Sequence, residues 1–400
     1  MPISSNPSHS IRRHVEAESI GGAPLRTFLR RGAAARILVA SALFLAFAVA
    51  LRAQEERPLL RVQDDCTAFG YAPDGRIAYS TRQIFHIKKA TYERDDIWMM
   101  LPNGSKRRLL EGEKFVRGDT PLSYTVRAFH WSPDSKQLAV ELFMTKFTNA
   151  HGDVTQGAQT LLLDDAGREI KVPGLDSLVP GATDAQWLPD DDTLVYLTQA
   201  MSAIGPYSVK ELRTTSGAAT PLFEGHGFAT VAWSAQLRGG IAIEMPNSRA
   251  GTIRLEWIDL EKQTVRELAS LDAFVSGLSI SPSGRRVAYF IDPEVIEVRD
   301  LDSPQRVARA HVAVGTFYWA PDESRILLKR GPERVSRDIV WIELPPLAVA
   351  APRSPIPIPE VIPQPIFHDL EYPEFAISPD GRNLAIIDPG KGNLSVYPLP

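Results

Sequence analysis

One short pattern recurs seven times along the chain and constrains its fold more than any other feature. Each copy has an aromatic or apolar residue, a turn built on Pro-Asp or an equivalent, and a short apolar run, as in WSPDSKQLAVEL at Trp131–Leu142. The other copies begin at Tyr71, Trp187, Trp233, Ile280, Trp319 and Ile377. Proline presets a turn and cannot donate a strand hydrogen bond, while aspartate and glycine accept turn conformations. Each copy therefore predicts two antiparallel strands joined by a tight turn, with the aspartates shaping the turns.

Two further strands are predicted after each hairpin. DIWMML is followed by the turn signal PNG at 102–104 and then by the weaker strand KRRLLE, and most other copies continue in the same way. Repeated units of four antiparallel strands, each of about 40–45 residues, are typical of propeller blades. The prolines of the motif, or their equivalents, lie 39 to 60 residues apart, so the longer units should carry loop insertions. The sequence predicts an all-β fold, a β-propeller of four-stranded antiparallel blades.

The aromatic residue before Pro-Asp-Gly, together with DIWMMLPNGSKRRLL, resembles the TolB-like, WD-repeat-like β-propeller family over roughly residues 57–400. Seven copies favour seven blades, whereas TolB itself resembles a six-bladed form, so both counts stay open. The fourth copy departs most from the family pattern, because AQLRGG stands where Pro-Asp-Gly is expected. The resemblance implies a bacterial periplasmic setting and protein partners, although one propeller fold serves many functions.

The two ends of the predicted propeller complement each other. The last unit supplies only three strands, ending with LSVYPL, and PLLRVQ at 58–63 precedes the first hairpin. We predict that PLLRVQ is the missing fourth strand of the last blade. The segment 345–365 holds eight prolines and interrupts the sixth blade before its fourth strand. It is expected to be a stiff spacer over the rim or a partner-binding arm.

The first 53 residues differ in composition from the rest of the chain. They contain seven Arg, no Lys and two Glu, a net charge of +5, which leaves −9 for the remainder of a chain of net charge −4. An uncharged apolar run, Ile37–Leu51, follows Arg36 and leads to small residues ending at Ala53. As a helix it would be roughly 22 Å long, shorter than a hydrocarbon core of about 30 Å.

We therefore divide the chain into a basic leader, 1–53, and a β-propeller, 54–400, with its Pro-rich insertion at 345–365. The leader is expected to be a cleaved signal peptide that places the propeller in the periplasm or elsewhere outside the cytoplasm. The alternative is an inner-membrane anchor that tethers the propeller through residues 33–53.

Several function classes find no support in the sequence. The weak net charge argues against nucleic acid as a partner, and the single cysteine, Cys66, excludes an internal disulfide. No phosphate loop, dinucleotide fingerprint or metal-spaced Cys/His cluster is present, and GLSIS at 277–281 lacks the second glycine of a nucleophile elbow. We expect no enzymatic activity, no cofactor and no bound metal.

Long connections between the second and third strands of a blade are the predicted binding surface, because such loops on a rigid scaffold often carry function. They span 80–96, which is basic, 145–158, which is polar, 199–207 and 329–338. The candidate binding residues are Arg82, His86, Lys88, Lys89, Arg94, His151 and Asp153. This surface would bind a protein of the bacterial cell envelope.

The alternative function is a glycan-binding, small-molecule-binding or hydrolytic propeller with its site at the mouth of the central channel. The candidates at the ends of the innermost strands are Asp184, Thr230, Thr316 and Glu374. Convergent acidic groups there would favour this alternative over a protein-binding module.

Overall fold

The structure is a computed structural model, and a compact unit runs from Glu56 to Pro400. The described residues are 58–87, 90–115, 122–147, 154–175, 177–199, 207–234, 236–244, 252–271, 275–292, 295–312, 315–330, 337–349, 364–370, 374–388 and 391–399. The leader lies outside them, as do Lys88, Lys89, His151 and Asp153. Within these ranges, no helix has the length and apolar character that crossing a membrane requires.

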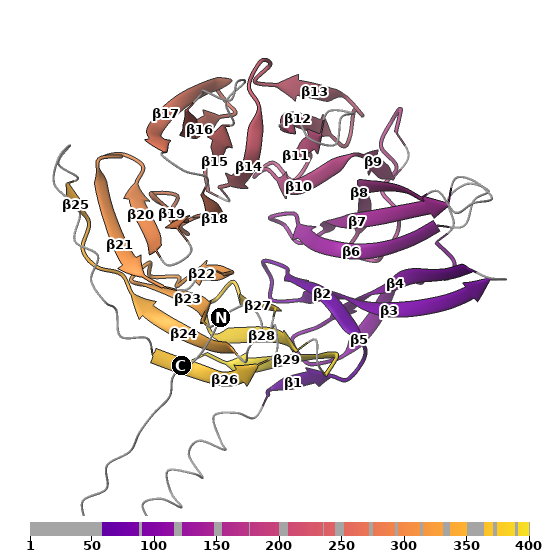
Figure 1. Cartoon of the computed structure of the whole chain (residues 1–400). Helices are drawn as coiled ribbons and strands as arrows, with labels where there is room; N and C mark the ends of the chain where they lie inside the picture. The colour runs from indigo at the N-terminus through magenta and orange to yellow at the C-terminus, as the bar shows by residue number, and fades with distance from the viewer. Residues whose placement is uncertain are drawn as a thin grey trace, which may run out of the picture. The chain divides into compact units, whose positions relative to one another are not determined.

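The described strands group into antiparallel units of four, named blades 1 to 7 (Figure 1). They follow chain order, except that the first strand belongs to the last blade and one short strand of the Pro-rich segment belongs to none. Blade 1 comprises β2 (Cys66–Tyr71), β3 (Ile77–Ile87), β4 (Ala90–Met100) and β5 (Lys106–Leu110). Blade 2 comprises β6 (Leu122–Trp131), β7 (Gln137–Phe147), β8 (Val154–Asp164) and β9 (Leu178–Pro180). Blade 3 comprises β10 (Ala182–Trp187), β11 (Thr193–Gln199), β12 (Tyr207–Arg213) and β13 (Ala219–Leu222). Blades 4 and 5 comprise β14 (Phe228–Trp233), β15 (Gly239–Glu244), β16 (Ile253–Asp259) and β17 (Thr264–Leu271); and β18 (Ser276–Ile280), β19 (Arg286–Asp292), β20 (Val295–Asp300) and β21 (Arg306–His311). Blades 6 and 7 comprise β22 (Phe317–Trp319), β23 (Arg325–Arg330), β24 (Arg337–Glu343) and β26 (Gln364–Leu370); and β27 (Glu374–Ile377), β28 (Asn383–Asp388), β29 (Asn393–Pro398) and β1 (Leu60–Val62). The all-β antiparallel fold predicted from the sequence is confirmed.

The first strand of the chain completes the last blade, as the strand count predicted. β1 lies antiparallel to β29, with Leu60 opposite Val396 and Val62 opposite Leu394 (Figure 1). Apolar side chains of blades 7 and 1 then share one buried cluster, which includes Val62, Tyr79 and Val396. Similar clusters join each of the other neighbouring pairs of blades. Because the last blade packs on the first, the blades close into a ring.

The aspartates of the repeated motif serve the turns, as expected. In blade 7, the Ser378 hydroxyl donates to Asp380 Oδ1 at 2.5 Å, and the backbone N–H of Arg382 donates to the same oxygen at 3.1 Å. Gly381 adopts the φ of +72° that this turn requires. Ser132 and Asp134 repeat the serine–aspartate contact in blade 2, at 2.7 Å. The face that carries these turns is called the turn face below.

Two predicted loops are instead extensions of strands. β3 and β4 remain paired from Ile77↔Met100 to Ile87↔Ala90, and β7 and β8 remain paired to Phe147↔Val154. The expected loop at 80–96 is thus a long hairpin. Its sequence explains the difference, because aromatic residues meet across the strands at Phe85↔Tyr92, and such pairs stabilise sheets.

The Pro-rich segment separates the third and fourth strands of blade 6, β24 and β26, at the predicted place. Its described beginning forms the short strand β25 (Ala348–Val349), which pairs with β21 on the outer edge of blade 5. Val349 is 67% exposed. Residues 350–363, which include most of the prolines, lie outside the described residues.

Candidate functional site

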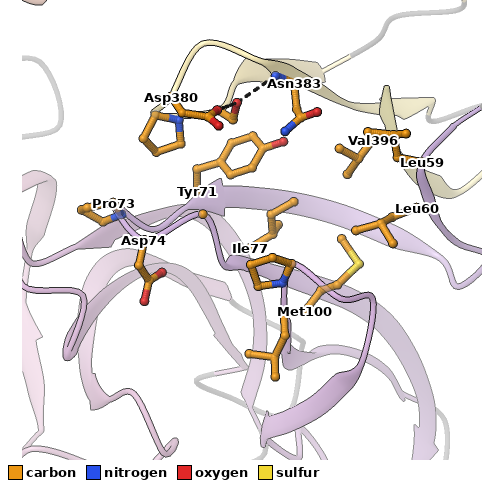
Figure 2. Close-up of a pocket in the computed structure, with 15 residues that line it drawn as sticks. Leu59, Leu60, Tyr71, Pro73, Asp74, Ile77, Met100, Asp380, Asn383 and Val396 are labelled. Atoms are coloured by element: carbon orange, nitrogen blue, oxygen red, sulfur yellow. Dashed lines mark hydrogen bonds between the residues drawn. The ribbon is translucent and has the colours of Figure 1, made fainter. Parts of the chain in front are cut away.

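A pocket of about 430 Å³ opens on the turn face between blades 7 and 1, where the ring closes (Figure 2). We call it the seam pocket. It is lined by Leu59, Leu60, Tyr71, Pro73, Asp74, Gly75, Ile77, Met100, Leu101, Pro102, Ser378, Pro379, Asp380, Asn383 and Val396. The ends of the described chain, the first hairpin turn and the last hairpin turn therefore all contribute to one hollow.

The inner part of the seam pocket is apolar. Ile77, Met100 and Val396 are at most 4% exposed and hold the pocket in place through the cluster shared by blades 7 and 1. Leu59, in contrast, is 59% exposed, although its backbone N–H is anchored to the Val396 carbonyl at 2.7 Å. A fixed backbone with an exposed leucine gives the pocket a rigid apolar edge.

Tyr71 brings a hydrogen-bond donor into this apolar surface. Its hydroxyl is buried and has no hydrogen-bond partner, and Figure 2 shows it directed towards Asn383 across the seam. Burial raises the pKa of Tyr71, and the negative charge of Asp380 adds to the effect. The hydroxyl therefore keeps its proton, and an unsatisfied buried hydroxyl costs about 1–3 kcal/mol that a bound acceptor can offset.

Two carboxylates lie at the rim of the pocket. The Ser378 hydroxyl and the N–H of Arg382 lower the pKa of Asp380, so this group stays ionised. Asp74 pairs with Arg76, whose Nε lies 2.7 Å away, and its charge is largely offset. The pocket as a whole can hold an apolar group, donate one hydrogen bond from Tyr71 and attract a cation to Asp380.

The predicted binding residues lie away from this pocket, on the β3–β4 hairpin or outside the described residues. Arg82 is engaged within the hairpin, with Nε 2.5 Å from the buried Asp95 and Nη1 2.8 Å from Glu93. Arg94 is only 8% exposed and donates from Nη1 to the Glu113 carbonyl at 3.2 Å. The positive charge predicted there is thus partly neutralised within the fold.

His86 is the exposed member of the predicted set within the described hairpin, and its Nδ1 lies 3.3 Å from Thr91 Oγ1. Ile84, two residues earlier, is 59% exposed. Lys88, Lys89, His151 and Asp153 lie outside the described residues. The hairpin face stays a prediction as a binding surface.

The four channel-mouth candidates belong to four different blades. Burial raises the pKa of Asp184, with a contribution from Glu141, and the residue has a positive φ of 47°. Desolvation by neighbouring atoms also raises the pKa of Glu374, while Lys329 opposes it. Thr230 is half-buried and Thr316 is exposed. In the described ranges, the side chains grouped closely enough to share a metal ion include none of these four.

Sequence reasoning missed the seam pocket because it treated Tyr71 and Asp380 only as parts of hairpins. A signal was nevertheless present. Tyr71 occupies the position at which Trp131, Trp187 and Trp319 occur in other copies, and it alone among these places a hydroxyl there. Combined with the predicted pairing of 58–63 to the last blade, this hydroxyl would have been assigned to the closure of the ring.

Comparisons with known proteins bear on the fold. No family model matches the sequence, and no curated protein matches it. A chain in a crystal structure of the mitotic checkpoint complex is similar over 86% of this chain and 96% of its own length, with a TM-score of 0.55 and 13% identity. TolB from Acinetobacter baumannii is aligned over 69% of this chain and 61% of its own, with a TM-score of 0.39 and 11% identity. The β-propeller fold predicted from the Pro-Asp-Gly hairpins is confirmed by the first of these similarities.

Proposed function

We propose that this chain is an exported, non-enzymatic β-propeller that binds a protein partner at the bacterial cell envelope. We further propose that the seam pocket holds an extended segment of that partner. The observation that carries the proposal is the combination, in one pocket, of the exposed Leu59, the unpartnered Tyr71 hydroxyl and the ionised Asp380.

An extended peptide supplies what each part of the pocket lacks. A backbone carbonyl can accept the Tyr71 hydrogen bond, and an apolar side chain can cover Leu59. A lysine or arginine next to that side chain can approach Asp380, which no basic side chain pairs with in the described contacts. Buried apolar anchors with a satisfied polar rim are typical of the energetic centre of protein interfaces.

Export is supported by the sequence of the leader. Its net charge of +5, its apolar run Ile37–Leu51 and the small residues ending at Ala53 together match a secretory signal. The mass of the mature N-terminus, measured on protein from fractionated cells, tests this part. A start after Ala53 or Ala50 in the periplasmic fraction supports cleavage, whereas an intact leader in the membrane fraction supports the anchor.

The proposed lack of enzymatic activity is supported by the sequence, which contains no nucleophile elbow, phosphate loop or dinucleotide fingerprint. The similarity in fold to other propellers does not indicate any particular activity, because propellers serve many functions. Protein binding is accordingly the function that the pocket supports best.

Site-specific photocrosslinking in intact cells tests the partner and the face together. A photoreactive amino acid is placed at Leu59 in the pocket, at Leu237 in the blade 4 hairpin turn, or at Ile84 on the β3–β4 hairpin. All three side chains are exposed, by 59%, 42% and 59% respectively, so they are matched probes of different surfaces.

One recurrent protein captured from Leu59 but not from Leu237 supports the proposal, and Tyr71→Phe and Asp380→Lys should reduce its yield. Capture from Ile84 alone would move the binding surface to the hairpin, where reversing the charge of Lys88 and Lys89 should then abolish it. The absence of any recurrent protein from all three positions, with the chain well recovered, would overturn protein binding.

A further inference from the structure

A second group of side chains that could bind a ligand lies between blades 3 and 4. It consists of His226, in the connection from β13 to β14, and of Glu244 and Glu256 in blade 4. Glu244 ends β15 opposite Arg254 of β16, and Glu256 lies opposite Ala242. Side chains paired in this way point to the same side of a sheet. The two carboxylates therefore lie together, on the side of blade 4 whose Ala242 packs against blade 3.

The potential ligand atoms are close to one another. His226 Nδ1 lies 2.6 Å from Glu244 Oε1, and one atom from each of His226, Glu244 and Glu256 falls within 4.8 Å of the others. Zinc binds imidazole nitrogen and carboxylate oxygen at about 2.0–2.2 Å, which places tetrahedral ligand atoms roughly 3.3 Å apart. Small side-chain movements are sufficient to reach that spacing.

The environment of the Glu256 carboxylate indicates that this cluster binds a ligand. It is 3% exposed, and its Oε2 is buried without a hydrogen-bond partner. Glu244 is equally enclosed, at 5% exposed. Two buried carboxylates repel each other when both are ionised, and burial without a partner adds a further cost. A cation bound between the two carboxylates would reduce their repulsion and offset the cost of burying them.

Arg254 supplies part of that positive charge, but it leaves Glu256 incompletely paired. Its Nη2 contacts Glu244, whereas its Nε lies 3.6 Å from Glu256 Oε1, beyond hydrogen-bond distance. The Arg254 side chain is 43% exposed, so it can turn towards solvent. The His226 side chain is 36% exposed, which gives a metal ion a path into the cluster.

We propose that His226, Glu244 and Glu256 bind one divalent transition-metal cation of the zinc class. One imidazole nitrogen and two carboxylate oxygens provide three ligands, and the fourth position faces solvent. This combination of nitrogen and oxygen ligands suits zinc and its neighbours in the first transition row. The bound ion ties the connection between blades 3 and 4 to blade 4 itself. The proposal does not depend on the proposed function, because it concerns different residues and another part of the ring.

The test uses the full chain, stripped with a chelator and titrated with Zn²⁺ by calorimetry, with metal content measured by mass spectrometry. The ligand variants are Glu256→Gln and His226→Asn, the second of which changes a side chain at the surface. Arg254→Gln removes the competing cation. Glu261→Gln, at an exposed turn of the same blade, is the matched control. Circular dichroism establishes that each variant is folded.

We expect one equivalent of zinc per chain, binding weakened at least about tenfold in both ligand variants, and unchanged binding in Glu261→Gln. Arg254→Gln should bind zinc at least as tightly as the unmodified chain, because the guanidinium competes for Glu244. A metal content well below one equivalent, or zinc binding that His226→Asn and Glu256→Gln leave intact, would overturn the proposal. Weaker binding in Arg254→Gln would also count against it.

Discussion

The closure of the ring by β1 leads to the most direct test of the fold. Val62 is 0% exposed and belongs to the cluster that joins blades 7 and 1. Its neighbour Arg61 is exposed and points to the other side of the same strand. Val62→Ala should therefore destabilise the propeller, whereas Arg61→Ala should have little effect, although both lie in the same three-residue strand.

The size of the effect follows from the volume removed. Val62→Ala deletes two methyl groups, which contribute about 0.8 kcal/mol each when fully buried. A cavity of roughly 50 Å³ that does not relax adds about 1 kcal/mol, at about 24 cal/mol per Å³. We expect a total of about 2–3 kcal/mol, and less than about 0.5 kcal/mol for Arg61→Ala, as is usual for surface changes.

Thermal unfolding measures this difference. The entropy of unfolding is about 2.1 cal/mol/K per residue, or roughly 0.7 kcal/mol/K for a unit spanning Glu56–Pro400. Val62→Ala should lower Tm by about 3–4 °C, and Arg61→Ala by less than about 1 °C. Equal shifts in the two variants would refute the reasoning, because they would show that the strand does not bury one face against the seam.

Three further changes test contacts elsewhere. Gly381→Ala should lower the thermal stability by about 2 kcal/mol or more, because φ is +72° and the added Cβ would lie 2.3 Å from Pro321 Cγ. Asp380→Asn should flatten the pH dependence of stability in an acid titration followed by circular dichroism. The pKa of Asp380 is lowered from 3.8, so its stabilisation is complete above about pH 4 and is lost as the pH falls through the lowered value. Asp95→Ala should cost about 1–3 kcal/mol in denaturant unfolding, because the buried backbone N–H of Val126, which donates to Asp95 Oδ2 at 2.8 Å, would lose its acceptor. An unchanged transition in any variant would contradict the corresponding contact.

The strands could be predicted from the sequence because the hairpin chemistry is local. Pro-Asp-Gly fixes a turn within four residues, and the alternating apolar residues on either side fix two strands. The fourth strand of the last blade was also within reach, because a missing strand at one end matched a spare strand at the other. The hairpin at 80–96 was not predicted, because Arg82, Lys88 and Arg94 suggested a solvated loop. Their neighbours Phe85 and Tyr92 pair across the strands instead.

The candidate sites were harder to predict, because both depend on contacts between distant segments. His226 and Glu244 are 18 residues apart, on a connection and on a strand, and no local spacing rule relates them. The seam pocket joins turns near residues 73 and 380. Charge, which is visible in the sequence, identified Arg82 and Arg94, yet the fold uses both in internal contacts. A charged residue is informative about binding only once its partners in the fold are known.

Both sites occur where one copy of the repeat differs from the others. At the seam, the last blade takes its fourth strand from the other end of the described chain, and this leaves Leu59 exposed beside a tyrosine where four other copies have tryptophan. In blade 4, the copy that departs most from the motif also contains the buried Glu256 without a partner for Oε2. Unsatisfied buried groups also occur in regular blades, for example at Trp131 Nε1 and Trp319 Nε1, but Tyr71 and Glu256 differ because each lies near a carboxylate, Asp380 or Glu244. In a ring of similar units, an unsatisfied buried group beside an ionisable side chain is therefore the structural indication of a ligand site that we follow at both positions.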